Sequence, residues 1–155
     1  MVRTDGCLVA CVCDGAGSAA RSDEGARTLA RRVAHALAHD PRALLRSPDA
    51  WEQVAAAVQA TRDALSPLAD LAAFHATLCG VVLTPAGSLA FHLGDGVIFG
   101  INPENWGDYL VSEPENGEFA ETTYFFTLPD WRRHLRVMCA PARFRTWFLM
   151  TDGTA

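Results

Sequence analysis

The stretch "VCDGAGSAARSDEGA", residues 12–26, joins an apolar segment to a helix through an aspartate and a run of glycines and other small residues. The segment before it, "CLVACVC" at 7–13, is apolar at both its odd and its even positions, so we expect a β-strand covered on both faces. The same kind of junction recurs at "HLGDG" (92–96) and at "FLMTDG" (148–153). Three hydrophobic segments therefore each end on an Asp-Gly pair.

Two helices are predicted after the first junction. Apolar residues recur at helical spacing along one side of 22–39, which indicates an amphipathic helix. Residues 40–50 form a connection with two prolines, in which Ser47 and Pro48 are typical of a helix N-cap and first turn. A second helix follows over 51–66. No strand is expected between these two helices.

The pattern changes to strands after residue 75. The segment "ATLCGVVLTPAGSLAFHLGDGVIFGI" (76–101) predicts three strands separated by two glycine-containing turns. Further short strands are predicted at 108–112, 122–128, 135–139 and 146–150. Helices come early and hairpin-connected strands come later, so the fold class is α+β with antiparallel sheet.

The composition of the 155 residues describes one globular domain, with half of the residues hydrophobic and a fifth charged. The net charge of −5 argues against a nucleic-acid partner, because phosphate binding needs clustered basic residues. We find no membrane-spanning run and no signal-peptide core, so we expect a cytoplasmic protein without a membrane partner.

The five cysteines are odd in number, and Cys7, Cys11 and Cys13 fall on one face of the first predicted strand. A disulfide framework would distribute them differently, which favours reduced thiols in the core. A zinc site is the alternative, but the cluster lacks a fourth ligand at ordinary spacing. His35 and His39 have a spacing that can bind a metal, yet they lie opposite the apolar stripe and are better interpreted as a solvated face.

The Asp-Gly pairs have a simpler interpretation, because Asp-Gly is common in hairpin turns. We accept it for Asp5-Gly6, and at Asp95-Gly96 a turn and a functional role are equally favoured. Residues 15–20, "GAGSAA", also match the dinucleotide-binding fingerprint. That fingerprint needs a parallel strand directly after the helix, whereas a second helix follows here, so we reject it.

Carboxylates at strand ends suit hard divalent cations, which prefer oxygen ligands. A glycine after the aspartate lets the backbone carbonyl approach the ion. If these junctions meet at one edge of two packed sheets, they form an acidic pocket whose repulsion a bound metal would offset.

The motifs "VCDGAGS", "ATLCGVVL", "FHLGDGVI", "GEFAETTYFFT" and "FLMTDG", in this order, closely resemble the bacterial branch of the metal-dependent protein phosphatase family, the protein phosphatase 2C-like enzymes. The resemblance covers nearly the whole chain. It implies an α-β-β-α sandwich of two antiparallel sheets flanked by helices. It also implies hydrolysis of phosphoserine or phosphothreonine in proteins by a water that two Mn²⁺ or Mg²⁺ ions activate, without a covalent enzyme intermediate.

The resemblance also assigns site residues. Asp14 would bridge the two ions, the Gly15 carbonyl would bind one of them, and Asp152 would bind the other. Asp95 matches a residue that helps hold a weaker third ion in some relatives. The catalytic residues are therefore predicted to be Asp14 and Asp152, and the metal ligands Asp14, Gly15, Asp95 and Asp152. The implied partners are a phosphorylated protein substrate and a cognate Ser/Thr kinase.

Family members have an earlier strand with a phosphate-binding arginine and a later strand with a further metal-binding aspartate. We therefore expect residues 1–155 to be a single domain that is incomplete at both ends. Two hypotheses follow: a metal-dependent Ser/Thr phosphatase, or a catalytically impaired pseudophosphatase that acts as a binding or regulatory domain.

The remaining aromatic and basic residues have plainer interpretations. Trp51 and Trp147 are expected in the core. Trp106 and Trp131 lie in polar loops, where a partner contact and a loop anchor are equally open. The arginines of "WRRHLR" (131–136) are interpreted as a solvated cluster, with a phosphopeptide contact as the alternative.

Overall fold

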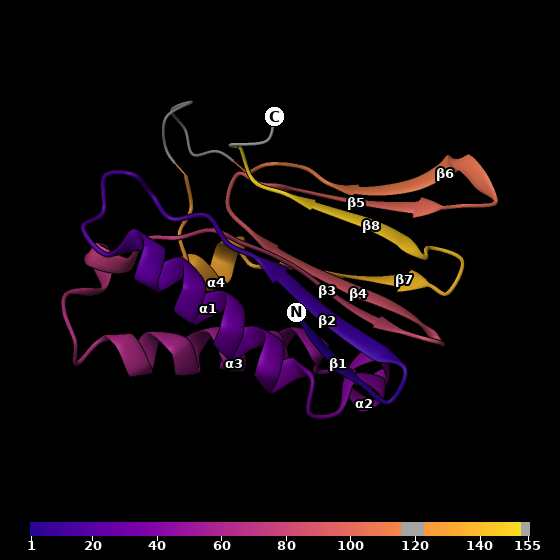
Figure 1. Cartoon of the computed structure of the whole chain (residues 1–155), viewed down its shortest axis with the longest axis horizontal. Coiled ribbons are helices and arrows are strands. Elements are labelled where there is room, and N and C mark those ends of the chain that lie inside the picture. Colours follow the sequence, from indigo (N-terminus) through magenta and orange to yellow (C-terminus); the bar gives the residue numbers. More distant parts are fainter. Residues whose placement is uncertain (116–122, 153–155) are drawn as a thin grey trace.

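The computed structural model describes residues 1–115 and 123–152. Two antiparallel sheets pack face to face, and the helices cover the outer face of the larger sheet (Figure 1). The predicted α+β class, with two antiparallel sheets and flanking helices, is confirmed. Within the described ranges the helical layer lies on the larger sheet alone, and the outer face of the smaller sheet carries no helix (Figure 1).

The larger sheet has five strands in the order β1-β2-β3-β4-β7, and every neighbouring pair is antiparallel. The smaller sheet has three strands in the order β6-β5-β8, also antiparallel. The strands span Val2–Thr4 (β1), Cys7–Val12 (β2), Leu78–Thr84 (β3), Gly87–Leu93 (β4), Val97–Asn102 (β5), Asn105–Ser112 (β6), Arg136–Pro141 (β7) and Thr146–Met150 (β8). Asp5 and Gly6 both have positive φ and form the β1–β2 hairpin turn, which confirms the prediction for this Asp-Gly pair.

The helices are α1 (Ser22–Leu37), α2 (Pro41–Arg46), α3 (Ala50–Leu65), the 3₁₀ turn η1 (Leu71–Phe74) and α4 (Trp131–His134). The two long helices confirm the predicted pair, and both pack on the larger sheet and on each other (Figure 1). The prediction of a plain connection over 40–50 was wrong, because Pro41 opens a short helix that the Asp40 side chain caps by accepting from the Ala43 N–H.

Three further predictions need correction. The N-cap of α3 is Asp49, two residues after the predicted Ser47, whose hydroxyl instead accepts from the Asp49 N–H. The predicted strand at 122–128 is a single bridge at Thr123 followed by turns in its described part, and Thr122 lies outside the described residues. The β2 strand is fully covered only on the helix side, since Val9 is buried whereas Val12 on the other face is 37% exposed.

The main core lies between α1, α3 and the helix-facing side of the larger sheet. Phe91 of β4 crosses over Gly80 of β3, where an added Cβ would lie 2.1 Å from the Phe91 ring, so this pair needs a glycine. The core between the two sheets is smaller and centres on Cys79, Ala90 and Ile98. The helix side therefore supplies most of the buried apolar surface.

All five cysteines are free thiols, as predicted. Burial raises the pKa of Cys11 and of Cys79 to about 12, so both thiols are neutral at physiological pH.

The outer face of the smaller sheet carries exposed aromatic side chains. Trp106 is 76% exposed and Tyr109 is 55% exposed, while Phe99 lies between Tyr109 and Phe148 with ring centroids 5.4 and 6.4 Å away. Among the helices of the described chain, none is long and apolar enough to cross a membrane.

Trp51 ties α3 to the start of β7, because its indole Nε1–H donates to the Leu135 carbonyl at 2.9 Å. We expect Trp51→Phe to lower the free energy of unfolding by about 1–2 kcal/mol, since it leaves the carbonyl of a buried residue without its donor. Urea denaturation measures the change as a lower midpoint at unchanged slope. Trp106→Phe is the matched control and should change stability by less than about 0.5 kcal/mol. Equal losses in the two variants would contradict the assigned role of this hydrogen bond.

Candidate active site

Asp14 lies two residues beyond the end of β2 and is anchored by its own backbone. Its carbonyl accepts from the Thr77 N–H at 2.9 Å, and its N–H donates to the Thr77 Oγ1 at 3.3 Å. The pairing continues through a bridge between Gly15 and Ala76. The backbone of Asp14 is thus fixed to the segment that leads into β3, while its carboxyl is left free for other contacts.

Gly15 is required by close packing rather than by an unusual φ. An added Cβ would lie 2.7 Å from both the carbonyl carbon and the carbonyl oxygen of Ser22, in the first turn of α1. A hollow of about 390 Å³ opens beside Asp14 and Gly15 and is also lined by Ser22, Asp23 and Arg27. A larger hollow of about 560 Å³ lies by the β1–β2 hairpin and includes none of the three predicted junctions.

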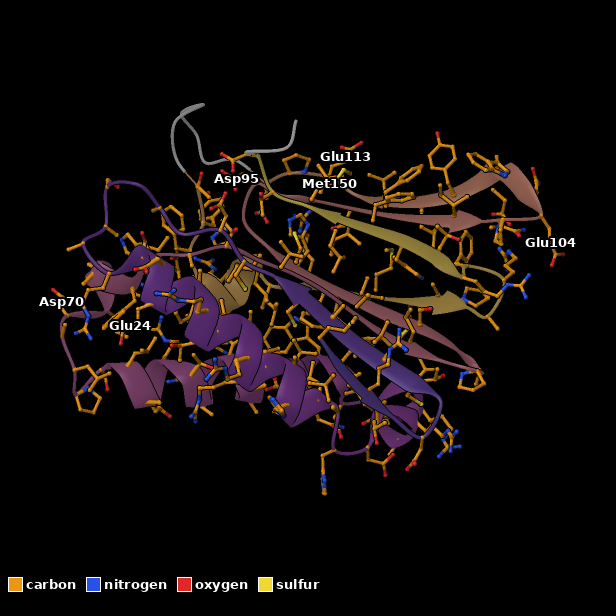
Figure 2. The ribbon with its side chains drawn as sticks, in the orientation of Figure 1. Glu24, Asp70, Asp95, Glu104, Glu113 and Met150 are labelled. Carbon is orange, nitrogen blue, oxygen red and sulfur yellow. The ribbon has the colours of Figure 1, made fainter. Side chains whose placement is uncertain are left out.

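Strand pairing brings two of the acidic junctions together. Val97 at the start of β5 pairs with Met150 at the end of β8. Asp95 precedes Val97 by two residues and Asp152 follows Met150 by two, so the register places both at the same end of the smaller sheet. Figure 2 shows Asp95 and Met150 near each other at this end.

Asp14 and Asp152 come from different sheets and share a hydrogen bond between their side chains. The pKa of Asp14 is raised above its ordinary value, first by burial, then by this hydrogen bond and by the negative charge of Asp152. The charge of Asp95 raises it further, while a hydrogen bond from the Gly15 backbone lowers it. Two carboxylates this close repel each other when both are ionised, and a bound cation would offset that repulsion.

Asp95 sits in a tightly packed turn. Gly94 has a φ of +109°, a conformation that favours glycine. A Cβ at Gly96 would lie 2.6 Å from the Cys79 Sγ and 2.6 Å from the Met150 carbonyl oxygen. The Asp95 carboxylate accepts from the Thr123 Oγ1 at 2.6 Å. The turn therefore connects β4 of the larger sheet to β5 of the smaller sheet, and it holds the Asp95 carboxylate close enough for its charge to act on Asp14.

The donor set fits a hard cation in kind, because all the predicted contacts are carboxylate or carbonyl oxygens. The described residues do not, however, gather three or more His, Cys, Asp or Glu side chains into a group that could hold a metal ion. Asp14 and Asp152 are in contact, and Asp95 is within electrostatic range of Asp14. The predicted ligands thus converge at one end of the sandwich as a pair with a third carboxylate nearby, and Gly153 of the last motif lies outside the described residues.

Several residues around this site were not predicted. Thr77 fixes the Asp14 backbone, and the only sequence signal was a polar residue immediately before an apolar strand. Thr123 binds Asp95, but a contact across 28 residues leaves no local pattern. Glu115 and His134 are hydrogen-bonded near the same turn, with Glu115 Oε1 2.9 Å from His134 Nδ1.

The interpretation of the 131–136 arginines as a solvated cluster holds for Arg132 and Arg133, which are exposed, and is wrong for Arg136. Arg132 pairs with Glu52 at 2.6 Å and stacks over two tryptophans, one of which, Trp131, is 2% exposed and belongs to the core rather than to a polar loop. Arg136 points inward to His92. His35 and His39 are exposed, as predicted.

The family model for protein phosphatase 2C matches residues 1–155. The chain belongs to the protein phosphatase 2C family. A search of curated proteins found no match to the sequence.

Solved structures give the same fold at low sequence identity. A variant of a bacterial serine phosphatase has a TM-score of 0.66 at 14% identity, with 94% of this chain and 63% of that chain covered. A stage II sporulation E family protein from Thermanaerovibrio acidaminovorans has a TM-score of 0.64 at 18% identity, with 97% and 78% covered. PppA, described as a key regulatory component of T6SS in Pseudomonas aeruginosa, has a TM-score of 0.59 at 14% identity, with 96% and 66% covered. These likenesses support the protein phosphatase 2C fold, and the chain spans less than two thirds of the first of these structures.

Proposed function

We propose that this chain is the catalytic part of a metal-dependent protein phosphatase that hydrolyses phosphoserine and phosphothreonine in proteins. The observation that carries the proposal is the contact between the carboxyls of Asp14 and Asp152, at the end of the smaller sheet where strand pairing also places Asp95. A divalent cation bound between the two carboxylates would relieve their repulsion.

Each of the four predicted residues has a role in this proposal. Asp14 and Asp152 would hold two Mn²⁺ or Mg²⁺ ions, Gly15 would contribute its carbonyl, and Asp95 would help hold a third. When bound, such ions supply the Lewis acidity that activates water and neutralises charge on a phosphoryl group. Thr77 holds the Asp14 backbone in place, and the hollow beside Asp14 would give room for a phosphorylated side chain.

A phosphoprotein would be the substrate, and the kinase that phosphorylates it would be the functional partner. Family membership and the serine phosphatase fold support this substrate class. The hollow at Asp14 is also lined by Arg27, a cation at the edge of the proposed phosphate site, although this arginine is paired with Asp23 on the same helix.

A second candidate is a catalytically impaired pseudophosphatase that binds phosphoproteins without hydrolysing them. It is favoured by the finding that the described residues bring only two of the acidic side chains into direct contact and no group of three into metal-binding positions.

Hydrolysis of a small aryl phosphate and of a phosphoserine peptide by the full chain separates the two candidates. For the phosphatase we expect turnover that depends on Mn²⁺ and stops when a chelator removes the metal. Binding of the phosphopeptide with no turnover at any Mn²⁺ concentration would support the pseudophosphatase. Turnover that persists after complete metal removal would contradict both.

A further inference from the structure

We propose that Glu115 is a positioning residue that holds the turn 94–96 in place, and with it the carboxylate of Asp95. The proposal deepens the proposed function, because it assigns support for one of the predicted metal ligands. Glu115 lies 20 residues after Asp95 in the sequence, yet its backbone N–H donates to the Gly94 carbonyl at 3.0 Å. This hydrogen bond attaches Glu115 directly to the turn.

The side chain of Glu115 links the turn to α4. Its Oε1 is 2.9 Å from the His134 Nδ1, near the end of that helix. The His134 ring stacks on Tyr124, with ring centroids 3.5 Å apart and planes 10° apart. Tyr124 follows Thr123, whose hydroxyl binds the Asp95 carboxylate. Contacts through His134 and the Thr123–Tyr124 segment therefore also connect Glu115 to the Asp95 carboxylate.

Arg136 on β7 also connects Glu115 to the strand that precedes the turn. The Arg136 Nε is 3.7 Å from the Glu115 Oε2, an ionic contact that is too long for a hydrogen bond. Arg136 Nη2 lies 2.9 Å from the buried His92 Nδ1, on the strand that leads into the turn. Because a guanidinium can only donate, the His92 Nδ1 must accept, which leaves the ring proton on Nε2. Burial, then the charge of Arg136, lowers the pKa of His92 to about 3, so the ring stays neutral.

Packing makes this turn sensitive to its attachments. A Cβ at Gly94 would lie 2.7 Å from the Thr77 Cγ2 and 3.0 Å from the Tyr124 carbonyl oxygen. The turn therefore packs between Thr77, which fixes Asp14, and Tyr124, which Glu115 supports through His134. Removing the Glu115 carboxylate should loosen the packing on the Tyr124 side and leave the Thr77 contacts with Asp14 in place.

Glu113 provides a matched control on the same segment. It has the same charge, is exposed, and makes no hydrogen bond or ion pair with any described residue. Figure 2 shows it at the same end of the molecule as Asp95. Glu113→Ala therefore removes an equal charge from this end of the molecule without removing a support.

The first measurement is amide hydrogen exchange of the metal-free full chain. We expect Glu115→Ala to accelerate exchange of the residue 115 amide, which donates to the Gly94 carbonyl of the turn, by about tenfold or more and to leave the amides of β3 unchanged. Glu115→Gln, whose amide oxygen can still accept from His134, should restore most of the protection, and Glu113→Ala should match the wild type. Unchanged exchange of the residue 115 amide in Glu115→Ala, or an equal increase throughout β3, would overturn the proposal.

The second measurement is Mn²⁺ binding, followed by the paramagnetic resonance signal of the free ion. Loss of a residue that supports a metal ligand typically weakens binding by about 10–100-fold, and we expect the lower end for Glu115→Ala. Asp95→Asn should abolish this sensitivity, so that the double variant binds no more weakly than Asp95→Asn alone. An equal loss in both backgrounds would mean that Glu115 does not act through Asp95. A wild-type chain that binds no Mn²⁺ would overturn the proposed function, while the exchange measurement would still decide the role of Glu115.

Discussion

Replacing Asp14 with Asn should strongly reduce the proposed metal-dependent phosphatase activity and, at neutral pH without metal, raise stability. An amide cannot hold two cations, so transition-state stabilisation of several kcal/mol is lost and hydrolysis of an aryl phosphate should fall by about 10³-fold. Steady-state rates at saturating Mn²⁺ measure this effect. Asp49→Asn is the control, since Asp49 is an exposed N-cap position where Asp and Asn are equivalent.

The stability change follows from the raised pKa of Asp14. Between its unfolded pKa, about 3.9, and its higher folded pKa, the native state binds a proton that the unfolded chain has released. The free energy of unfolding therefore falls as pH rises through this range, and the whole of this decrease is present above the folded pKa. The asparagine side chain of Asp14→Asn cannot ionise and can donate to the Asp152 carboxylate, so the variant avoids this decrease.

Thermal melts at two pH values test the predicted direction of this stability change. Without metal at pH 7, Asp14→Asn should melt at a higher temperature than the wild type, and at pH 3 the difference should disappear. Adding Mn²⁺ should stabilise the wild type more than the variant. A variant that melts lower than the wild type at both pH values would show that the Asp14 carboxyl supports the fold instead of being repelled within it.

The sequence contained enough to predict the ends of strands and the order of elements. Asp14, Asp95 and Asp152 each follow an apolar strand, and the helix pair 22–39 and 51–66 corresponds to α1 and α3. Helical spacing and alternation are local, so they can be read from one sequence. Even the missed α2 had a local signal, because Asp40 and Pro41 are typical of a cap and first helical position.

The convergence of the carboxylates could not be predicted in the same way. Asp95 and Asp152 lie at the same end of the smaller sheet because Val97 pairs with Met150, and nothing in either strand specifies a partner 53 residues away. Trp131 was placed in a polar loop for a similar reason. Its neighbours along the chain are charged, but it packs in the main core, beside the guanidinium of Arg62 on α3. Tertiary contacts of this kind leave no periodicity in the sequence.

Gly25→Ala should destabilise the protein although it places a better helix former inside α1. The helical propensity of alanine is worth about 1 kcal/mol over glycine. An added Cβ at Gly25, however, would lie 2.3 Å from the carbonyl oxygen of Phe74, a backbone atom that cannot rotate away. The segment after Phe74 is fixed as well, because the His75 carbonyl accepts from the Ala16 N–H and Thr77 pairs with Asp14. Overpacking of this kind typically costs about 1–3 kcal/mol, and contact with fixed backbone places Gly25 at or above the upper end.

We therefore expect a net loss of about 2 kcal/mol, which for a domain of this size lowers Tm by roughly 4–8 °C. Gly17→Ala is the control, because no atom lies within 4 Å of its added Cβ and its φ is not positive. There the smaller entropy of the unfolded chain should leave stability unchanged or raise it by up to about 1 kcal/mol. Since η1 leads directly into the residues that anchor Asp14, Gly25→Ala should also weaken Mn²⁺ binding, and Gly17→Ala should not. Equal stability of the two variants would mean that α1 does not pack this closely against Phe74, and the fixed position of Asp14 would lose its structural basis.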